Sequence, residues 1–242
     1  SMGIAISDPV SEFMVQKRYV PKNRMKTIVS GISLDELGKS KLSKGEVSVA
    51  LSAPQGAKII GIVGRLHEIK GHHYFIEAAH QLITQGENCH FLIVGDGDLR
   101  QSLEETSIRL GMTEHIDFLG HCDDMPGIYD RLDALVVASE IEGGPGVLLE
   151  ALASACVVVS SNTIGLKSEV DGQDFVSFVP AKDSRAIARA LTELLQDDEQ
   201  LFKYQSSAKI FAKKLKETVT KLQQCYKGLV GKKVDHINGA GE

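Results

Sequence analysis

Short, mostly apolar runs recur along the middle of the chain, and most of them are bounded by glycine or by charged residues. Runs of this length without polar alternation are typical of strands that are buried on both faces of a parallel sheet. We predict six such strands. They occupy residues 58–63, 90–94, 115–119, 134–138, 157–160 and 175–179.

The stretches between these runs have helical character. Apolar residues recur at helical spacing over 74–83, and shorter helices are predicted at 125–132 and 147–155. Asp98 and Asp183 stand where the N-caps of two further helices are expected. Strands that alternate with helices predict an α/β fold with a doubly wound, Rossmann-like parallel sheet.

The segments outside this pattern are less regular. Residues 1–34 combine strand-like pieces with a brief amphipathic helix, and we interpret them as the end of a preceding domain. Residues 35–56 are polar and rich in Lys, Ser and Gly, which favours a linker. We place the main domain at 57–230, where it ends in a lysine-rich helix, and we expect a disordered tail at 231–242.

Composition narrows the classes of function. The 242 residues carry a formal net charge of −5, which argues against a nucleic-acid-binding surface. No apolar run approaches the roughly 20 residues that a membrane-spanning helix needs. The four cysteines are scattered and His72 and His73 are adjacent on a helix, so we expect reduced thiols, a cytoplasmic protein and no metal site.

Glycines follow several of the predicted strands, at Gly64, Gly95, Gly97 and Gly120 and again within 143–146. The carboxyl ends of parallel strands meet at one edge of a sheet, and this edge is where such folds bind ligands. Backbone N–H groups at the following helix N-termini are suited to anions. We therefore expect one ligand site there.

Two carboxylates, Glu142 and Glu150, flank the glycine-rich turn after the fourth strand. Glu142 is expected to project from the loop, and Glu150 to lie about one turn into the next helix. Together they suit a sugar nucleotide, whose hydroxyls need acceptors and whose diphosphate needs N–H donors. The alternative is that both are ordinary surface carboxylates, with Glu150 favoured by the helix dipole.

The loop after the first strand carries two cations, Arg65 and Lys70. A planar guanidinium and a point charge are suited to a diphosphate, although a solvated loop with two ordinary basic residues is the alternative. The Gly95-Asp96-Gly97 turn lacks the third glycine of a dinucleotide fingerprint, because Arg100 occupies that position. A tight strand-to-helix turn explains it equally well.

Taken together and in this order, these motifs resemble the retaining glycosyltransferases of the GT-B fold, in the family 4 (group 1) class. The resemblance covers roughly residues 1 to 230 as the C-terminal, donor-binding half. It implies that Glu142, Arg65 and Lys70 are catalytic: Glu142 faces the transferred sugar, and the two cations bind the diphosphate. The resemblance further places Glu150 on the ribose and the region of Gly120 and 125–126 near the nucleobase. The donor-binding set is completed by Gly64, Gly95, Gly143, Gly144, Gly146 and Val147.

The resemblance also implies a reaction. The full-length enzyme is expected to transfer a hexosyl group with retention from a nucleotide-diphosphate sugar, such as a UDP- or GDP-sugar, without a metal or other cofactor. The acceptor, a glycan or a lipid-linked glycan as in lipopolysaccharide or capsule synthesis, would bind an N-terminal domain of which 1–34 is the remnant. This chain alone is expected to transfer no sugar. A cytoplasmic location is implied, with peripheral contact at the inner membrane face as an option.

Three alternatives stay open at this point: a GT-B-fold sugar-nucleotide epimerase, a relative of glycogen or sucrose synthase, and a non-catalytic nucleotide-sugar-binding domain. The chain departs from the family pattern at Ala155 and Val157, where glycine and proline are usual, and at Gly165-Leu166, where paired glycines are usual. These positions lie near the expected end of the donor, so the identity of the donor stays open.

Overall fold

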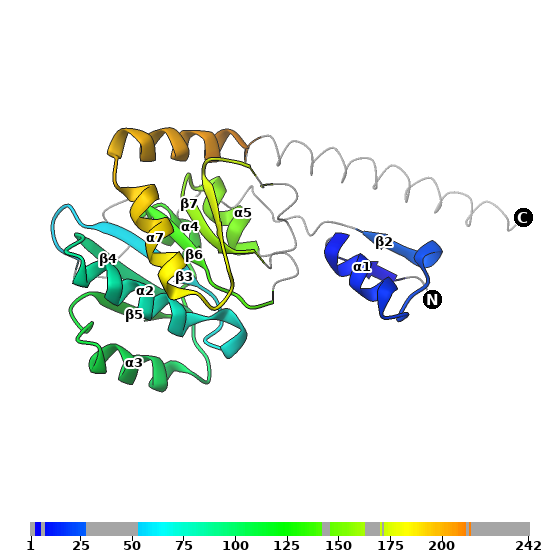
Figure 1. The fold of residues 1–242 in the computed structure, drawn as a ribbon, viewed down its shortest axis with the longest axis horizontal. Coiled ribbons are helices and arrows are strands. Elements are labelled where there is room, and N and C mark those ends of the chain that lie inside the picture. Colours follow the sequence, from blue (N-terminus) through cyan, green and yellow to red (C-terminus); the bar gives the residue numbers. More distant parts are fainter. Residues whose placement is uncertain are drawn as a thin grey trace, which may run out of the picture.

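The computed structural model describes residues 3–5, 8–27, 53–141, 146–162, 170, 172–211 and 213. Most of these residues belong to one six-stranded sheet and the helices that cover it (Figure 1). All strand pairs of this sheet are parallel. In sheet order the strands are β5 (Ile116–Gly120), β4 (Cys89–Val94), β3 (Lys58–Val63), β6 (Ala134–Val137), β7 (Val157–Ser161) and β8 (Val176–Val179).

This order confirms the predicted fold class. The chain starts at β3 in the middle, builds outward through β4 to β5, returns to pair β6 with β3, and continues outward to β8. The direction of progress reverses between β3 and β6, which makes that position the topological switch point of a Rossmann-like sheet. All six strands predicted from the apolar runs are present, and no end differs from its prediction by more than one residue.

Helices cover the sheet in two layers. On one side α2 contacts both α3 and α7, and on the other α4 contacts α5. Right-handed crossovers explain the division, because β3 to β4 and β6 to β7 proceed in opposite directions across the sheet. The helices are α2 (His72–Thr84), α3 (Arg100–Arg109), α4 (Met125–Tyr129), α5 (Gly146–Ala153) and α7 (Ser184–Leu195).

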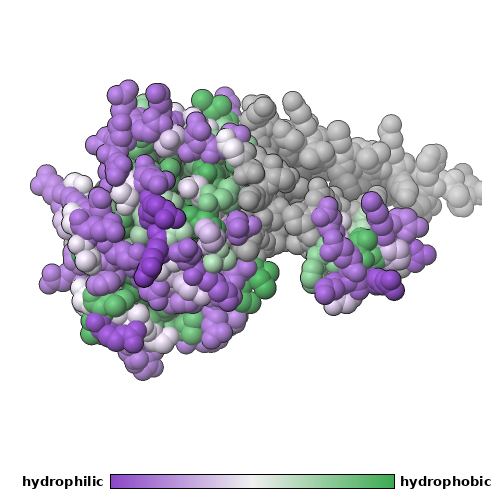
Figure 2. Space-filling model, in the orientation of Figure 1, coloured by the Kyte–Doolittle hydropathy of each residue, from purple (hydrophilic) through white to green (hydrophobic). Residues whose placement is uncertain are grey.

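The core follows from this layering. Every residue of β4, β6 and β7 is buried, as expected for strands covered on both faces. The outer surface over α2, α3 and α7 is mostly hydrophilic, with smaller apolar areas (Figure 2). Cys89 and Cys156 are buried free thiols as expected, but Cys122 is only partly buried, and Cys225 lies outside the described residues.

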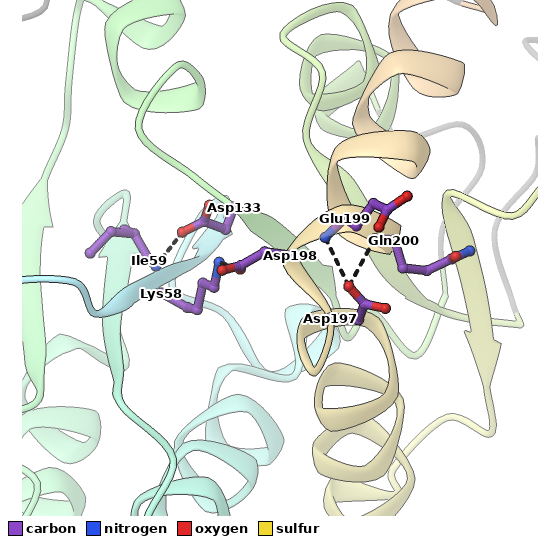
Figure 3. Close-up of polar contacts among 7 residues, drawn as sticks. All are labelled: Lys58, Ile59, Asp133, Asp197, Asp198, Glu199 and Gln200. Carbon is purple, nitrogen blue, oxygen red and sulfur yellow. Dashed lines mark hydrogen bonds and ion pairs between the residues drawn. The ribbon is translucent and has the colours of Figure 1, made fainter.

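Polar contacts fasten the amino edge of the sheet, opposite the glycine-rich edge. The Asp133 carboxylate accepts from the Ile59 N–H at 2.8 Å, and the Asp133 N–H donates to the Ile59 carbonyl at 2.8 Å. Lys58 on β3 forms an ion pair with Asp198, at the start of a helical stretch over 198–211 (Figure 3). Asp198 is 85% exposed, so we expect this pair to contribute less than about 1 kcal/mol.

One predicted helix cap is wrong and one is confirmed. The Asp183 carboxylate accepts from the Ala186 N–H at 2.8 Å and caps α7 as expected. Asp98 does not cap α3, because the helix begins at Arg100 with Leu99 in the N-cap position and no side-chain cap. The Leu99 N–H is bonded to the Leu66 carbonyl at 3.2 Å, and the Asp98 carboxylate pairs with Arg65 of the same neighbouring loop.

The N-terminal residues form a small unit of their own. Strand β1 (Gly3–Ala5) pairs in parallel with β2 (Met25–Thr27), and α1 (Asp8–Gln16) connects them. The predicted strand, helix and strand of this region are therefore present. The predicted domain limits themselves stay a prediction, since residues 28–52 lie outside the described part of the chain.

Candidate functional site

The candidate site lies at the carboxyl edge of the sheet, where β3 and β6 end side by side. Three loops meet there: 64–71 after β3, 95–99 after β4, and 138–141 after β6. Open α/β sheets bind ligands in the crevice at this switch point. Hydrogen bonds and close backbone approaches hold these loops together.

The loop after β3 carries the two predicted cations. Gly64 opens it, with its N–H bonded to the Val94 carbonyl at 2.9 Å. Lys70 folds back over this glycine, since a Cβ built on Gly64 would lie 3.8 Å from Lys70 Cδ. Arg65 is largely exposed, and one of its guanidinium nitrogens lies 3.5 Å from Asp98. Both cations therefore belong to one short segment, and Arg65 keeps most of its guanidinium in solvent.

The glycines after β4 allow two loops to approach closely. A Cβ on Gly95 would lie 2.1 Å from the Gly64 carbonyl oxygen, which leaves no room for any other residue. Backbone hydrogen bonds then connect the loops: Leu66 N–H to the Asp96 carbonyl at 3.0 Å, and Gly95 N–H to the Gly120 carbonyl at 2.7 Å. Gly95 and Gly97 thus allow the loop after β4 to pack closely against the loop after β3, in agreement with their interpretation as a tight turn.

The loop after β6 is anchored on two sides. The Glu140 N–H donates to the Ile69 carbonyl at 2.8 Å, which fixes this loop against 64–71. The Glu140 carboxylate also lies 2.8 Å from the Lys182 ammonium, contributed by the turn before α7. The hydrogen bond with Glu140 raises the pKa of Lys182. These contacts fix the backbone two residues before Glu142, and sequence reasoning had assigned no role to Glu140 or Lys182.

Part of the predicted site cannot be placed. Glu142, Gly143 and Gly144 lie outside the described residues, so their assigned roles stay predictions. The description resumes at Gly146, the first residue of α5, and Val147 packs partly against the core. Glu150 lies one turn into α5, as expected, and is partly buried.

Glu150 has a partner that sequence reasoning missed. The Tyr129 hydroxyl, at the end of α4, donates to Glu150 Oε2 at 2.7 Å. Tyr129 is 0% exposed, and its burial, together with the nearby Glu150 charge, raises the pKa of the phenol well above its usual range. A tyrosine among apolar residues is an ordinary core residue in a sequence, so only the tertiary pairing identifies it.

His72, the first residue of α2, is another buried polar group beside the site. It is 1% exposed, and neither ring nitrogen has a hydrogen-bond partner among the described residues. Burial first, and then the charges of Lys70 and His73, lower its pKa from 6.5 to about 4. The imidazole is therefore neutral at neutral pH and adds no third positive charge to the loop.

The region assigned to the nucleobase lies beside these loops. Gly120 ends β5 and accepts the Gly95 N–H, and Met125 begins α4, whose N-terminus is capped by Asp124. The Arg100 guanidinium covers the Phe118 ring at 5.4 Å and donates to the Phe118 carbonyl at 3.1 Å. Among the described residues, no group of three His, Cys, Asp or Glu side chains is placed to hold a metal ion.

Comparison with known proteins agrees with this arrangement. The family model described as glycosyl transferases group 1 matches residues 57–197, more than half of the chain. A D-inositol 3-phosphate glycosyltransferase of Corynebacterium urealyticum is 34% identical over 160 residues, which are 62% of this chain and 38% of that protein. An uncharacterised glycosyltransferase of Methanocaldococcus jannaschii is 30% identical over 202 residues, 80% of this chain and 50% of that protein. This chain spans about half the length of these relatives or less.

A solved structure extends the likeness to the fold. HepE of Anabaena, in complex with UDP and glucose, superposes with a TM-score of 0.82 at 22% identity, over 96% of this chain and 63% of HepE. In the described part of the chain, we find no helix with the length and apolar character needed to cross a membrane. The family match and the sheet order together give the conclusion that this chain belongs to the group 1 glycosyl transferases and has the fold of a GT-B glycosyltransferase C-terminal domain.

Proposed function

We propose that this chain binds the nucleotide-diphosphate sugar donor of a retaining hexosyltransferase. The observation that carries the proposal is the convergence of Arg65, Lys70 and Glu150 on one edge of the sheet at its switch point. The HepE complex with UDP and glucose supports it, because that protein has the same fold and its ligand UDP is a nucleoside diphosphate.

The chemistry assigns each residue a task. As the bond between the sugar and the diphosphate breaks, negative charge develops on the diphosphate, and the positive charges of Arg65 and Lys70 stabilise it. Glu150 accepts hydrogen bonds from the ribose hydroxyls. Glu142 faces the sugar, where its carboxylate stabilises the oxocarbenium-like state while the acceptor attacks from the same face. The enzyme accelerates the transfer further by holding the donor sugar and the acceptor hydroxyl close together and correctly oriented.

The acceptor belongs to a second domain in this proposal. We infer that a complete enzyme adds the acceptor-binding half, and that its acceptor is a glycan or lipid-linked glycan of the bacterial cell surface. A relative supports this class: a Campylobacter jejuni transferase, 35% identical over 142 residues, is named for an undecaprenol-linked saccharide. Without that domain, this chain binds donor weakly and transfers no sugar.

Calorimetry of the chain with UDP, GDP and ADP tests the donor site. We expect weak binding of at least one of them, reduced about tenfold or more by Lys70→Met or Arg65→Gln, the range for a charge-assisted hydrogen bond. Arg109→Gln is the matched control, because Arg109 ends α3 at the opposite edge of the sheet. Absence of binding by all three nucleotides, or equal losses in the control, would contradict the proposal.

A further inference from the structure

The Tyr129–Glu150 hydrogen bond joins two elements at the candidate site. Tyr129 ends α4, Glu150 lies in α5, and these helices contact each other. The hydroxyl-to-Oε2 distance of 2.7 Å is that of a charge-assisted bond. Tyr129 is also the largest side chain that is fully buried in the described part of the chain. Its hydroxyl therefore presents a fixed donor to a carboxylate that is itself only partly buried.

The polarity of this contact is defined. A carboxylate offers only acceptors, so the phenol must donate. Burial and the adjacent carboxylate both raise the pKa of Tyr129, so the hydroxyl keeps its proton at neutral pH. A buried tyrosine hydroxyl needs some partner, but a backbone carbonyl or a water would satisfy it equally well. Burial alone therefore does not explain why the Tyr129 hydroxyl is bonded to Glu150, the carboxylate assigned to donor binding.

The contact limits the freedom of Glu150. A free glutamate samples many rotamers, and ordering it at a binding site costs conformational entropy. The bond to Tyr129 orders the side chain before any ligand arrives. It uses Oε2, and the carboxylate has a second oxygen, Oε1, that can accept from an external donor.

We propose that Tyr129 is a positioning residue that holds Glu150 ready to accept the ribose hydroxyls of the donor nucleotide. The proposal rests on the donor-binding function proposed above. Tyr129 itself does not touch the donor. Its contribution is specific to the ribose, because the phenol acts only through the carboxylate that meets the two hydroxyls.

Calorimetry with two probes tests this role. Tyr129→Phe keeps the ring in the core and removes only the hydroxyl. We expect the variant to bind UDP about threefold to tenfold more weakly than the wild type, the factor that corresponds to ordering one long side chain. For 2′,3′-dideoxy-UDP, which lacks the hydroxyls, both proteins should bind with equal affinity. Glu150→Gln should show the same pattern with a larger loss.

A control variant and thermal unfolding separate positioning from folding. Tyr204→Phe removes a hydroxyl from a partly buried tyrosine on the helical stretch 198–211, and it should leave both affinities unchanged. Equal losses for UDP and the dideoxy probe would mean a general structural role and overturn the inference. Loss in Glu150→Gln without loss in Tyr129→Phe would overturn it while the donor site stands. If wild-type protein binds no nucleotide, the proposed function and this inference fall together.

Discussion

Two polar side chains beside the candidate site, Tyr129 and His72, are buried away from solvent. They differ in their hydrogen bonding. Tyr129 has a charged partner, whereas both ring nitrogens of His72 lack one among the described residues. A group that loses water without gaining a partner favours its neutral form. The titration of His72 should therefore affect the stability of the fold.

The His72 pKa predicts acid sensitivity. Because its folded pKa is about 4 and its unfolded value is 6.5, the unfolded chain binds a proton between these values that the folded chain does not. The free energy of unfolding should therefore fall as the pH drops from 6.5 towards 4, by no more than about 1.4 kcal/mol per pH unit. His72→Gln should flatten this part of the profile, measured by urea unfolding.

His121 is the matched control for this titration. It is 84% exposed, so His121→Gln should leave the acid slope unchanged. If His72→Gln and wild-type protein lose stability equally between pH 6.5 and 4, carboxylates elsewhere dominate and the role given to His72 is wrong.

Among the elements, the helix ends are set by different means. Helix α7 has the amphipathic pattern and the Asp183 cap that its sequence predicts. Helix α3 begins at Arg100 without a side-chain cap, and the turn before it is bonded to a neighbouring loop through the Leu99 N–H and the Leu66 carbonyl. An N-cap side chain, Asp183, thus marks the start of α7, whereas α3 begins without such a cap.

Two aspartates test this difference. Asp183→Ala should destabilise the protein by about 1 kcal/mol, the usual contribution of an N-cap. Asp98→Ala should change stability by less than about 0.5 kcal/mol, because Asp98 is exposed and caps nothing. Chemical denaturation of both variants under the same conditions measures the two values. Comparable losses would mean that Asp98 contributes to α3 after all.

In the whole molecule, the loops of the carboxyl edge are held by close backbone approach. A Cβ on Gly71 would lie 2.3 Å from the Ala138 carbonyl oxygen, so the start of α2 rests directly on the end of β6. The Glu140–Ile69 bond and the Lys182–Glu140 pair continue this contact toward Glu142. The segment that leads into the glycine-rich turn is consequently supported by elements from both halves of the sheet.

Gly71→Ala should disturb this support. Gly71 and Gly111 have nearly the same left-handed backbone, with φ of 69° and 70°, but a Cβ on Gly111 meets nothing within 4 Å. Gly111→Ala should therefore cost only the left-handed strain of about 1–2 kcal/mol. Gly71→Ala should cost about 2 kcal/mol more, because backbone must shift.

Donor affinity provides a second measurement for this pair. Binding of UDP should weaken in Gly71→Ala and stay unchanged in Gly111→Ala. Equal unfolding free energies in the two alanine variants would show that the contact with Ala138 does not constrain the edge.

The amino-acid sequence predicts both the class of fold and the edge of the sheet at which the candidate site lies. Apolar runs predicted all six strands, and the glycines that follow them predicted the edge at which Arg65, Lys70 and Glu150 lie. These features are local, because burial on both faces favours a continuous apolar run, and a tight turn with positive φ or close backbone approach favours glycine.

Which side chains meet depends on the tertiary structure. Tyr129 and Glu150 are 21 residues apart, and Lys182 and Glu140 lie on turns that follow different strands. Nothing in the spacing of such residues identifies a partner, since their distance depends on strand order and on how closely the loops can approach. The same holds for Asp98, whose carboxylate pairs with Arg65 of another loop and does not cap α3.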